Sequence, residues 1–539
     1  MTVSTMMDYP FTLTQILRHG AKVHAKREVV TWQGESARHV SFAETYERTQ
    51  RLAAGLRSLG VAPGDVVGTF CWNHQEHVEA YFAVPCMGAV LHTLNIRLFP
   101  EQLDFILRDG EDKVVIVDDS LVHLLAQAPE AVAELDHVIV VGDGDASVLG
   151  REVVRYDDLL AEQEPFFDWP ELDEYSAAEM CHTSGTTGNP KGVVYSHRAL
   201  WAVIFGGAAG GASMSTGDRT LVIVPQFHVN GWGLIHICWA KGCDILQPER
   251  YLQPEPLAKF IEAERPQFAG AVPTVWNGIL ALGQQRELDL SSLELVLVGG
   301  SAVPRSMIDA FKQRYDIDIQ QGWGMTEMLA IGTMAIPPTG VEEWEEELDW
   351  RVRAGTVVAG VDMRLIAEDG SEQPWDGVSV GEIEVRGPWI TGSYHKVDAP
   401  EKFHDGWLRT GDVGVIDEYG SLQIMDRTKD VIKSGGEWIS SVDLENSLIS
   451  HERVLEAAVI GVEDEKWGER PLGVVVRQPG VDVSLDDLSE YLDGRVAKWW
   501  VPERWAFIDE IPKTSVGKYD KKVLRARHEA GDLDTQTRQ

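Results

Sequence analysis

Thr183–Lys191 reads TSGTTGNPK, a run of small and hydroxylated residues that ends in a proline and a lysine. Glycine lets backbone N–H groups approach phosphate oxygens closely, hydroxyl groups add hydrogen-bond donors, and Lys191 adds a positive charge. The run does not match the P-loop pattern G-x-x-x-x-G-K-[ST], because Gly192 follows Lys191. Composition alone therefore leaves two interpretations open, a phosphate-binding loop and a polar surface turn.

The overall composition is that of a large globular protein with an acidic surface. At about 150 residues per domain, the 539 residues predict about three or four domains or subdomains. Asp and Glu number 85 against 48 Lys and Arg, which gives a formal net charge of −37. Such a surface repels nucleic acid, so we expect no nucleic-acid partner. An anionic ligand would need a local concentration of lysine and arginine.

The cysteines and the N-terminus bear on the cellular compartment. The five cysteines include no C-x-x-C pair, so we predict neither a disulfide framework nor a structural zinc site. The opening MTVSTMMDYPFTLTQ lacks the basic start and the apolar stretch of a signal peptide. The sequence also lacks a run of about 18 apolar residues, which a membrane-spanning helix requires. We therefore expect a cytoplasmic protein without a membrane span.

Apolar runs of strand length alternate with helix-like stretches, which predicts an α/β fold. Runs rich in Val, Ile and Leu between helices indicate parallel sheets that are buried on both faces. The stretch Phe42–Leu59 has apolar residues at helical spacing, and the acidic run Glu342–Asp349 is expected to be a solvated face or loop. Strands are predicted at Val66–Phe70, Lys113–Val117, His137–Val141, Thr220–Val224 and Leu293–Val298.

The pattern changes near Asp426. The segment Met425–Ser441 is dense in charge and glycine, and a short α+β pattern follows it. We therefore predict a large N-terminal domain of several subdomains (residues 1–425) and a small C-terminal domain (residues 426–539). In the small domain, strands are predicted at Ala457–Val462 and Leu472–Val476, and a helix at Leu485–Trp499.

Several motifs follow the first loop in a fixed order: YSHRAL from Tyr195, QGWGMTE from Gln321, WLRTGDVG from Trp407 and PKTSVGK from Pro512. On these motifs the chain resembles the adenylate-forming superfamily of acyl-CoA synthetases, luciferases and peptide-synthetase adenylation domains. The resemblance covers about residues 10 to 528. It implies that the C-terminal domain is a mobile lid and that the first loop binds ATP through Thr183, Ser184, Gly185, Thr186, Thr187, Gly188 and Lys191.

The resemblance assigns roles within QGWGMTE. Trp323 would lie against adenine, Thr326 near the α-phosphate, and Glu327 on Mg²⁺ together with Thr183, while Gly322 and Gly324 flank the nucleotide. An aromatic face stacks on adenine, and a carboxylate is a hard oxygen ligand for magnesium. The family has a tyrosine where this chain has Trp323, so the shape of the neighbouring acyl pocket is left open.

Two further motifs are expected near the acyl group. Leu293–Ala302 reads LELVLVGGSA, a buried strand that ends in small residues, and the resemblance places Gly300, Ser301 and Ala302 beside adenine and Gly299 at the acyl pocket. Pro225–Gly233 reads PQFHVNGWG. His228 would lie at the junction of acyl group and phosphate as a catalytic residue, although a lone histidine is otherwise a hydrogen-bonded core residue. Trp232 resembles the gate tryptophan of fatty acyl-CoA synthetases.

The remaining motifs concern ribose, coenzyme A and catalysis. The resemblance places the Asp412 carboxylate, which only accepts hydrogen bonds, on the ribose hydroxyls, with Arg427 and Lys433 in the ATP site. KSGGEW, from Lys433, would line the CoA channel through Gly435, Gly436 and Trp438, together with Glu469. Lys518 of PKTSVGK would be the catalytic lysine, because a preorganised positive charge stabilises the reacting anions. The alternative is a solvated lysine.

These expectations define an ATP-dependent acid–CoA ligase that forms an acyl-adenylate and then a thioester, with ATP, Mg²⁺ and CoA as cofactors or co-substrates. The lid would turn about Asp426 between the two reactions. QFHVNGWG with QGWGMTEM is most similar to the 3-methylmercaptopropionate–CoA ligase branch. The alternatives are a medium- or long-chain fatty acid–CoA ligase, an acyl-AMP ligase that transfers to a carrier protein, and a luciferase-like oxygenase. Fatty acyl-CoA synthetases of this kind are often homodimers, which we also expect here.

Overall fold

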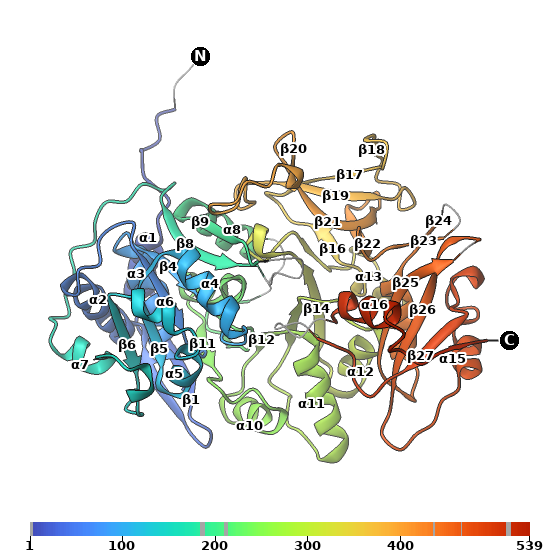
Figure 1. Ribbon diagram of the computed structural model, residues 1–539. Helices are drawn as coiled ribbons and strands as arrows, with labels where there is room; N and C mark the ends of the chain where they lie inside the picture. Colours follow the sequence, from blue (N-terminus) through green and yellow to red (C-terminus); the bar gives the residue numbers. More distant parts are fainter. Residues whose placement is uncertain are drawn as a thin grey trace.

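The computed structural model describes residues 4–183, 189–209, 214–434, 437–464, 466–513 and 519–538. Within these residues, three β-sheets and the helices packed on them build the fold. In Figure 1 the first sheet and its helices lie at the left in blue and teal, and the C-terminal sheet lies at the right in orange and red. The second and largest sheet connects these two parts.

The first sheet carries the stem of the predicted phosphate loop. Its order is β7-β6-β5-β3-β4-β8-β9, and all neighbours are parallel except β8 and β9, which are antiparallel. The strands are β3 (Val66–Phe70), β4 (Val90–Thr93), β5 (Asp112–Asp118), β6 (His137–Val141), β7 (Val154–Arg155), β8 (Ala177–His182) and β9 (Gly192–Ser196). The helices of this region are α1 (Leu13–Val23), α2 (Phe42–Ser58), α3 (Gln75–Cys86), α4 (Pro100–Gly110), α5 (Val122–Leu125), α6 (Pro129–Glu134), α7 (Tyr156–Ala161) and α8 (His197–Ala209).

The second sheet is parallel at one end and antiparallel at the other. The parallel part is β1 (Glu28–Trp32), β11 (Asp244–Gln247), β10 (Arg219–Val222), β12 (Phe268–Ala271), β13 (Leu295–Gly299) and β14 (Asp318–Trp323), with β2 (Ala37–Ser41) antiparallel at its edge. The antiparallel part is β15 (Thr333–Met334), β16 (Gly355–Val357), β17 (Asp362–Ile366), β18 (Glu372–Gln373), β19 (Gly381–Arg386), β20 (Phe403–His404), β21 (Trp407–Ile416) and β22 (Ser421–Arg427). The helices are α9 (Leu234–Lys241), α10 (Pro254–Glu264), α11 (Pro273–Gln285), α12 (Arg305–Tyr315) and α13 (Trp344–Arg351).

The third sheet belongs to the C-terminal part of the chain. Its order is β24-β23-β26-β27-β28, and β25 also pairs with β26. The strands are β23 (Ile432–Ser434), β24 (Glu437–Ile439), β25 (Val454–Asp464), β26 (Gly468–Arg477), β27 (Arg504–Phe507) and β28 (Thr535–Thr537). The helices are α14 (Ser441–Ile449), α15 (Leu485–Leu492) and α16 (Lys521–Glu529).

The chain passes from the large sheet to the third sheet at residues 428–431, directly after β22. Asp426 of β22 accepts a hydrogen bond from the backbone N–H of Ser441, the first residue of α14, across 3.0 Å. Lys521 at the start of α16 contacts the Ser441 hydroxyl and pairs with Glu445 at 2.8 Å. The predicted boundary residue therefore contacts the C-terminal elements, while the boundary itself stays a prediction.

The predicted α/β fold is confirmed, and β3 and β6 have the predicted bounds. The acidic run Glu342–Asp349 was expected to be a solvated face or a loop. Most of it lies in α13, where Leu348 and Arg351 are buried while Glu345, Glu346 and Asp349 are exposed, so the solvated-face alternative is confirmed. One local expectation was wrong. The helix predicted to reach residue 499 ends at Leu492, shortly before Gly494, whose φ of 79° cannot continue a right-handed helix.

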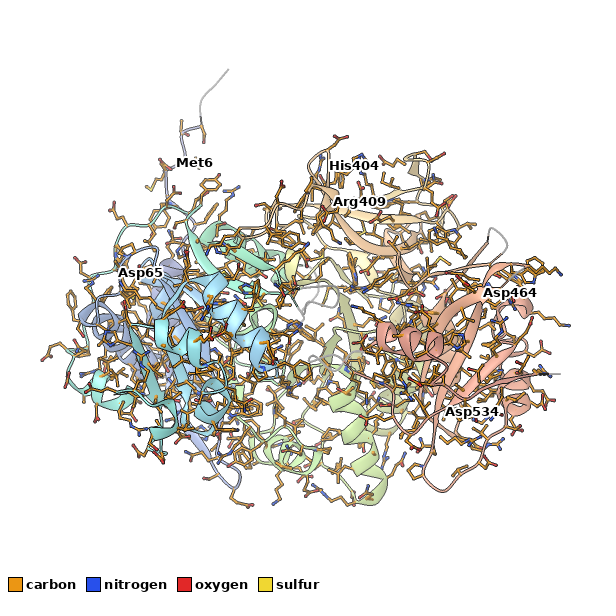
Figure 2. The ribbon with its side chains drawn as sticks, viewed as in Figure 1. Met6, Asp65, His404, Arg409, Asp464 and Asp534 are labelled. Carbon is orange, nitrogen blue, oxygen red and sulfur yellow. The ribbon has the colours of Figure 1, made fainter. Side chains whose placement is uncertain are left out.

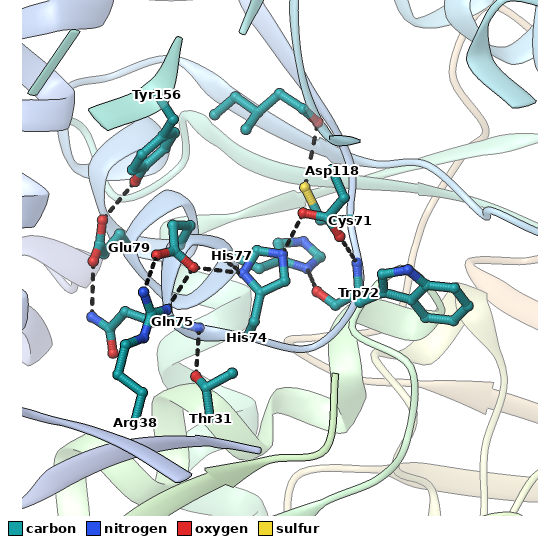
Figure 3. Close-up of polar contacts among 12 residues, drawn as sticks. Thr31, Arg38, Cys71, Trp72, His74, Gln75, His77, Glu79, Asp118 and Tyr156 are labelled. Carbon is teal, nitrogen blue, oxygen red and sulfur yellow. Dashed lines mark hydrogen bonds and ion pairs between the residues drawn. The ribbon is translucent and has the colours of Figure 1, made fainter. Parts of the chain in front are cut away.

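A buried polar network fills the space between α3 and the ends of β3 and β5 (Figure 3). The His74 Nε2 atom lies 2.7 Å from Asp118 Oδ1, and His74 Nδ1 lies 3.1 Å from a Glu76 oxygen. Burial alone would lower the pKa of His74, but the two carboxylates raise it well above its usual value. Cys71, His74 and Asp118 each offer one atom that could bind a metal ion, and these three atoms lie within 4.8 Å of one another. The network therefore holds charged groups inside the first half of the chain.

All five cysteines are buried, and none forms a disulfide. Among the helices of the described residues, none has both the length and the apolar character that crossing a bilayer needs.

Candidate active site

A cavity of about 920 Å³ is bounded by elements of the first two sheets and by the start of the C-terminal connection. Twelve of the residues predicted from the sequence line it: Thr183, Lys191, His228, Trp232, Gly299, Gly300, Ser301, Gly322, Gly324, Thr326, Glu327 and Arg427. The described lining does not include Ala302, Trp323, Asp412, Lys433, Trp438 or Glu469. The predicted residues Ser184, Gly185, Thr186, Thr187, Gly188, Gly435, Gly436 and Lys518 lie outside the described residues.

The stem of the first loop holds Thr183 and Lys191 against each other. The Thr183 N–H donates to the Lys191 carbonyl across 2.9 Å, and the Lys191 N–H donates to Thr183 Oγ1 across 3.0 Å. Because β8 and β9 are antiparallel, the two residues come from the adjacent ends of a hairpin. Lys191 Nζ lies 4.8 Å from the centre of the Tyr394 ring, so its charge faces an aromatic surface beside the cavity.

Glu327 lies in a short 3₁₀ turn that follows β14, and it is held from two sides. Tyr394 Oη donates to Glu327 Oε1 across 2.6 Å, and the Thr391 N–H donates to the Glu327 carbonyl across 2.8 Å. Burial and the adjacent Glu327 carboxylate raise the pKa of Tyr394, so its hydroxyl remains a donor. The Tyr195 hydroxyl group donates a hydrogen bond to the backbone carbonyl of the neighbouring Thr326 across 2.6 Å.

Tyr394 lines the cavity, and sequence reasoning missed it. Its surroundings, GSYHK, carry only a weak signal, an aromatic residue soon after a glycine. The separation of 67 residues from Glu327 gives no local pattern that could pair the two. Arg409 was missed for the same reason. It lies on β21, near His404 in Figure 2, lines the cavity and pairs with Glu382 of β19.

Trp323, Asp412 and Arg427 form a cluster next to the cavity. The Trp323 indole N–H donates to Asp412 Oδ2 across 2.9 Å, and Arg427 Nε lies 3.0 Å from Asp412 Oδ1. The Trp323 ring lies so close to Gly332 that a Cβ there would come within 2.9 Å of it. The predicted stacking of Trp323 on adenine stays a prediction, since the described lining does not include this residue.

The apolar wall of the cavity is built around Trp232. Its ring lies over Gly299 of β13, where a Cβ would come within 3.3 Å of it. Gly300 adopts a φ of 88°, which favours glycine at this turn. His228 lines the cavity, and its backbone N–H donates to the Pro225 carbonyl across 3.1 Å. Apolar side chains that line the wall include Val203, Val224, Leu234, Ile237, Leu297, Ile331 and Met334.

Of the residues predicted for the CoA channel, Trp438 lies on β24 and Glu469 on β26 of the C-terminal sheet. The Lys433 N–H donates to Glu469 Oε2 across 2.9 Å, and Lys433 Nζ lies 5.2 Å from the centre of the Trp438 ring. Lys433 also pairs with Glu368, which follows β17 of the large sheet. In this arrangement Lys433 lies away from the described cavity lining, so its predicted contact with ATP stays a prediction.

The residues that precede and follow the segment with Lys518 are paired with each other. The Asp520 N–H donates to the Pro512 carbonyl across 2.7 Å, and Lys513 forms a β-bridge with Tyr519. Lys513 also pairs with Glu456 of β25 at 2.5 Å. The residues that flank the predicted catalytic lysine are therefore fixed to the C-terminal sheet.

Three sheets and a cavity lined by Lys191, Thr326 and Glu327 agree with the fold expected of an adenylate-forming enzyme. The AMP-binding enzyme family matches residues 17–395, and the AMP-binding enzyme C-terminal domain matches residues 443–518. The chain belongs to the AMP-binding enzyme family and is an acyl-CoA synthetase of the adenylate-forming type.

Relatives with similar sequences match almost the whole chain. A 3-methylmercaptopropionyl-CoA ligase of Ruegeria lacuscaerulensis is 38% identical over 526 residues, which is 96% of this chain and 98% of the relative. A long-chain-fatty-acid–CoA ligase of Thermus thermophilus is 40% identical over 536 residues, with 97% of each chain covered. The crystal structure of the anthranilate CoA ligase AuaEII with anthranoyl-AMP matches with a TM-score of 0.87 and 26% identity, covering 97% of this chain and 99% of that one.

Proposed function

We propose that the protein activates a monocarboxylic acid with a short or medium apolar tail, with 3-methylmercaptopropionate as the first candidate, and joins it to CoA. The observation that carries this proposal is the composition of one cavity. It brings Lys191, Thr326 and Glu327 together with the apolar wall around Trp232. Two reacting anions need nearby positive charge, and an uncharged tail needs an apolar wall.

The chemistry proceeds in two steps. A carboxylate oxygen attacks the α-phosphorus of ATP, and pyrophosphate leaves, which gives the acyl-adenylate. The CoA thiol then attacks the acyl carbonyl, loses its proton, and AMP leaves. Positioning and charge neutralisation are the main demands of the first step. We assign the neutralising charge to Lys191 and Lys518, and ribose binding to Asp412 with Arg427.

Glu327 and Thr183 fit a magnesium ion, because a buried carboxylate and a hydroxyl are hard oxygen ligands. The ion would neutralise charge on the phosphates when it is bound. Tyr394 orients the Glu327 carboxylate from its other side. Turning of the C-terminal domain about Asp426, CoA binding near Trp438 and Glu469, a homodimer and a cytoplasmic location belong to the same proposal.

The tail preference rests on the wall around Trp232. Its lining side chains include Val203, Leu234 and Ile237, so a hydrocarbon or thioether tail is favoured over a charged one. The similarity to a 3-methylmercaptopropionyl-CoA ligase and to fatty acid–CoA ligases supports the same class of acid.

The test is pyrophosphate release with straight-chain acids from two to sixteen carbons and with 3-methylmercaptopropionate, followed by mass spectrometry of the thioester after CoA is added. We expect the highest kcat/KM with 3-methylmercaptopropionate or with acids of similar length. A maximum at twelve or more carbons would favour the long-chain alternative. An acyl-adenylate that CoA does not consume would favour an acyl-AMP ligase, and the absence of AMP with every acid would overturn the proposal.

A further inference from the structure

The turn that carries Trp232 is left-handed throughout. The backbone φ angles are 37° at Val229, 36° at Asn230, 58° at Gly231, 57° at Trp232 and 67° at Gly233. Each non-glycine residue in this conformation costs about 1–2 kcal/mol relative to a right-handed turn. Strain of this kind persists only where the surroundings impose it, and it collects at functional sites.

The side chain of Asn230 is held from two strands of the first sheet. Its Oδ1 atom accepts a hydrogen bond from Thr93 Oγ1 of β4 across 3.0 Å. Its Nδ2 atom donates to the Glu179 carboxyl group of β8. All three side chains are buried, with at most 2% of any of these residues exposed. The Asn230 amide therefore connects the turn to two strands of the sheet, next to the contacts that Cys181 of β8 makes with the backbone of Val229 and Asn230.

The hydrogen bond between Asn230 and Glu179 lies among groups that are uncharged at pH 7. Burial raises the pKa of Glu179 to about 8, so its carboxyl group is neutral at pH 7. His236 of α9 lies 3.4 Å from Glu179, and burial lowers the pKa of His236 to about 4. The nearby Tyr81, Cys181 and Tyr195 are also buried, and burial raises the pKa of each. Asn230 therefore bonds to a neutral partner in a surrounding of neutral groups.

The position of the turn fixes the position of the Trp232 ring. The ring lies over Gly299 of β13, and a Cβ at Gly270 of β12 would come within 3.9 Å of it. The absence of a side chain at Gly299 lets the ring approach β13 closely, while at Gly270 a Cβ would make only an ordinary contact with it. Because Trp232 lines the cavity, a shift of the turn would move the wall against which an acyl tail packs.

We propose that Thr93, Asn230 and Glu179 form a clamp that positions Trp232 and thereby sets the length of the acyl tail that the enzyme accepts. The inference rests on the proposed function, because it takes the wall around Trp232 as the acyl site. The three residues of the clamp are positioning residues that act through Trp232.

The first experiment removes the clamp without straining the turn. Asn230→Gly deletes the amide, while glycine adopts the left-handed conformation freely. In pyrophosphate release we expect the ratio of kcat/KM for decanoate over butyrate to rise by roughly tenfold, as expected for a changed apolar pocket. The KM for ATP should change by less than about twofold. Thr93→Val, which removes one of the two hydrogen bonds, should shift the ratio in the same direction by less.

The matched control is Gln50→Ala. Gln50 is a buried amide that also makes two hydrogen bonds, to Pro165 and Phe167, and it lies outside the cavity lining. Its loss should lower stability without moving the chain-length ratio. An equal shift in Gln50→Ala and Asn230→Gly would overturn the clamp, because general destabilisation would then explain both.

A double-mutant cycle tests whether Asn230 acts through Trp232. If it does, Asn230→Gly should change the chain-length ratio little once Trp232→Ala is present, and additive effects would contradict the clamp. Hydrogen exchange of residues 226–234 provides a readout that needs no substrate. Exchange there should become faster in Asn230→Gly, and unchanged exchange would overturn the clamp. If the wild-type enzyme activates no acid, the proposed function fails, while hydrogen exchange still decides the clamp.

Discussion

The hydroxyl group of Tyr394 donates to the carboxylate of Glu327 across 2.6 Å, and the ring of the same tyrosine lies 4.8 Å from the Lys191 ammonium. One aromatic side chain thus contacts both the proposed magnesium ligand and the lysine of the first loop. Its segment follows β19 of the antiparallel part of the large sheet, whereas Lys191 leads into the first sheet. Tyr394 therefore joins two parts of the site that are far apart in the sequence.

Tyr394→Phe should weaken the proposed ATP–magnesium site while preserving the ring beside Lys191. A hydrogen bond to a charged group contributes about 1.5–3 kcal/mol, so kcat/KM for ATP should fall by roughly tenfold to a hundredfold. The magnesium concentration for half-maximal pyrophosphate release should rise. Tyr175→Phe is the matched control, because Tyr175 is 69% exposed. An unchanged magnesium dependence in Tyr394→Phe would contradict the orienting role.

Glu179→Gln should alter how stability depends on pH. Burial raises the pKa of Glu179 to about 8 in the folded state, above its usual 4.5. The folded state then binds more protons than the unfolded state between these values, so this group makes stability fall as pH rises from about 4.5 to about 8. Glutamine cannot ionise. The free energy of unfolding of the variant should therefore rise relative to that of the wild type by up to a few kcal/mol across this interval.

Urea unfolding of both proteins at pH 5 and pH 8.5 measures this gain. Glu174→Gln changes a partly buried glutamate near the same strand and serves as the control, since the pKa of Glu174 is lowered, rather than raised, by a hydrogen bond from the Phe11 N–H and by Arg198. A difference between Glu179→Gln and the wild type that is the same at both pH values would refute the neutral carboxyl group.

His74→Gln should show its largest cost at low pH. The carboxylates of Asp118 and Glu76 raise the pKa of His74 against the effect of burial. The ion pairs therefore stabilise the fold fully below the unfolded pKa of about 6.5, and this contribution is lost as pH rises through the folded value. The stability gap between wild type and variant, measured by chemical unfolding, should narrow as pH increases above 7. His123→Gln, which changes an exposed histidine, is the control. Its stability should differ little from that of the wild type at every pH.

Lys518→Ala should separate the two half-reactions. If Lys518 neutralises charge only while the adenylate forms, pyrophosphate release should fall by roughly two to three orders of magnitude, as for other preorganised charges. Thioester formation from supplied acyl-adenylate should fall much less. Lys522→Ala, which changes an exposed lysine of α16, is the control. Equal losses in both half-reactions would argue against a lysine that serves one step only.

The sequence motifs predicted the elements that line the cavity, because each motif is local. Thr183, Thr326 and Glu327 each lie shortly after a strand, where a short pattern of small and polar residues marks a candidate site. The bounds of β3 and β6 followed from continuous apolar runs. The acidic run that forms α13 left both a solvated face and a loop open, because the single buried Leu348 gives little apolar pattern.

The pairs that hold the site together could not be predicted in the same way. Asn230 and Glu179 are 51 residues apart, and Tyr394 and Glu327 are 67 residues apart. Which residues meet depends on the register and order of the strands, and these are set by packing across the whole sheet. The left-handed turn at residues 229–233 likewise depends on buried partners, since Val229 and Trp232 do not favour that conformation locally.

The contacts of Asp412 show how the fold accommodates a buried carboxylate. Trp323 donates to one oxygen of this buried carboxylate and Arg427 pairs with the other. A buried anion deprived of donors would destabilise the native chain by several kcal/mol. Trp323 and Arg427 supply these donors from within the chain, so protein groups alone balance the charge of Asp412. Because the three residues lie on β14, β21 and β22, the carboxylate also ties these three strands of the large sheet together.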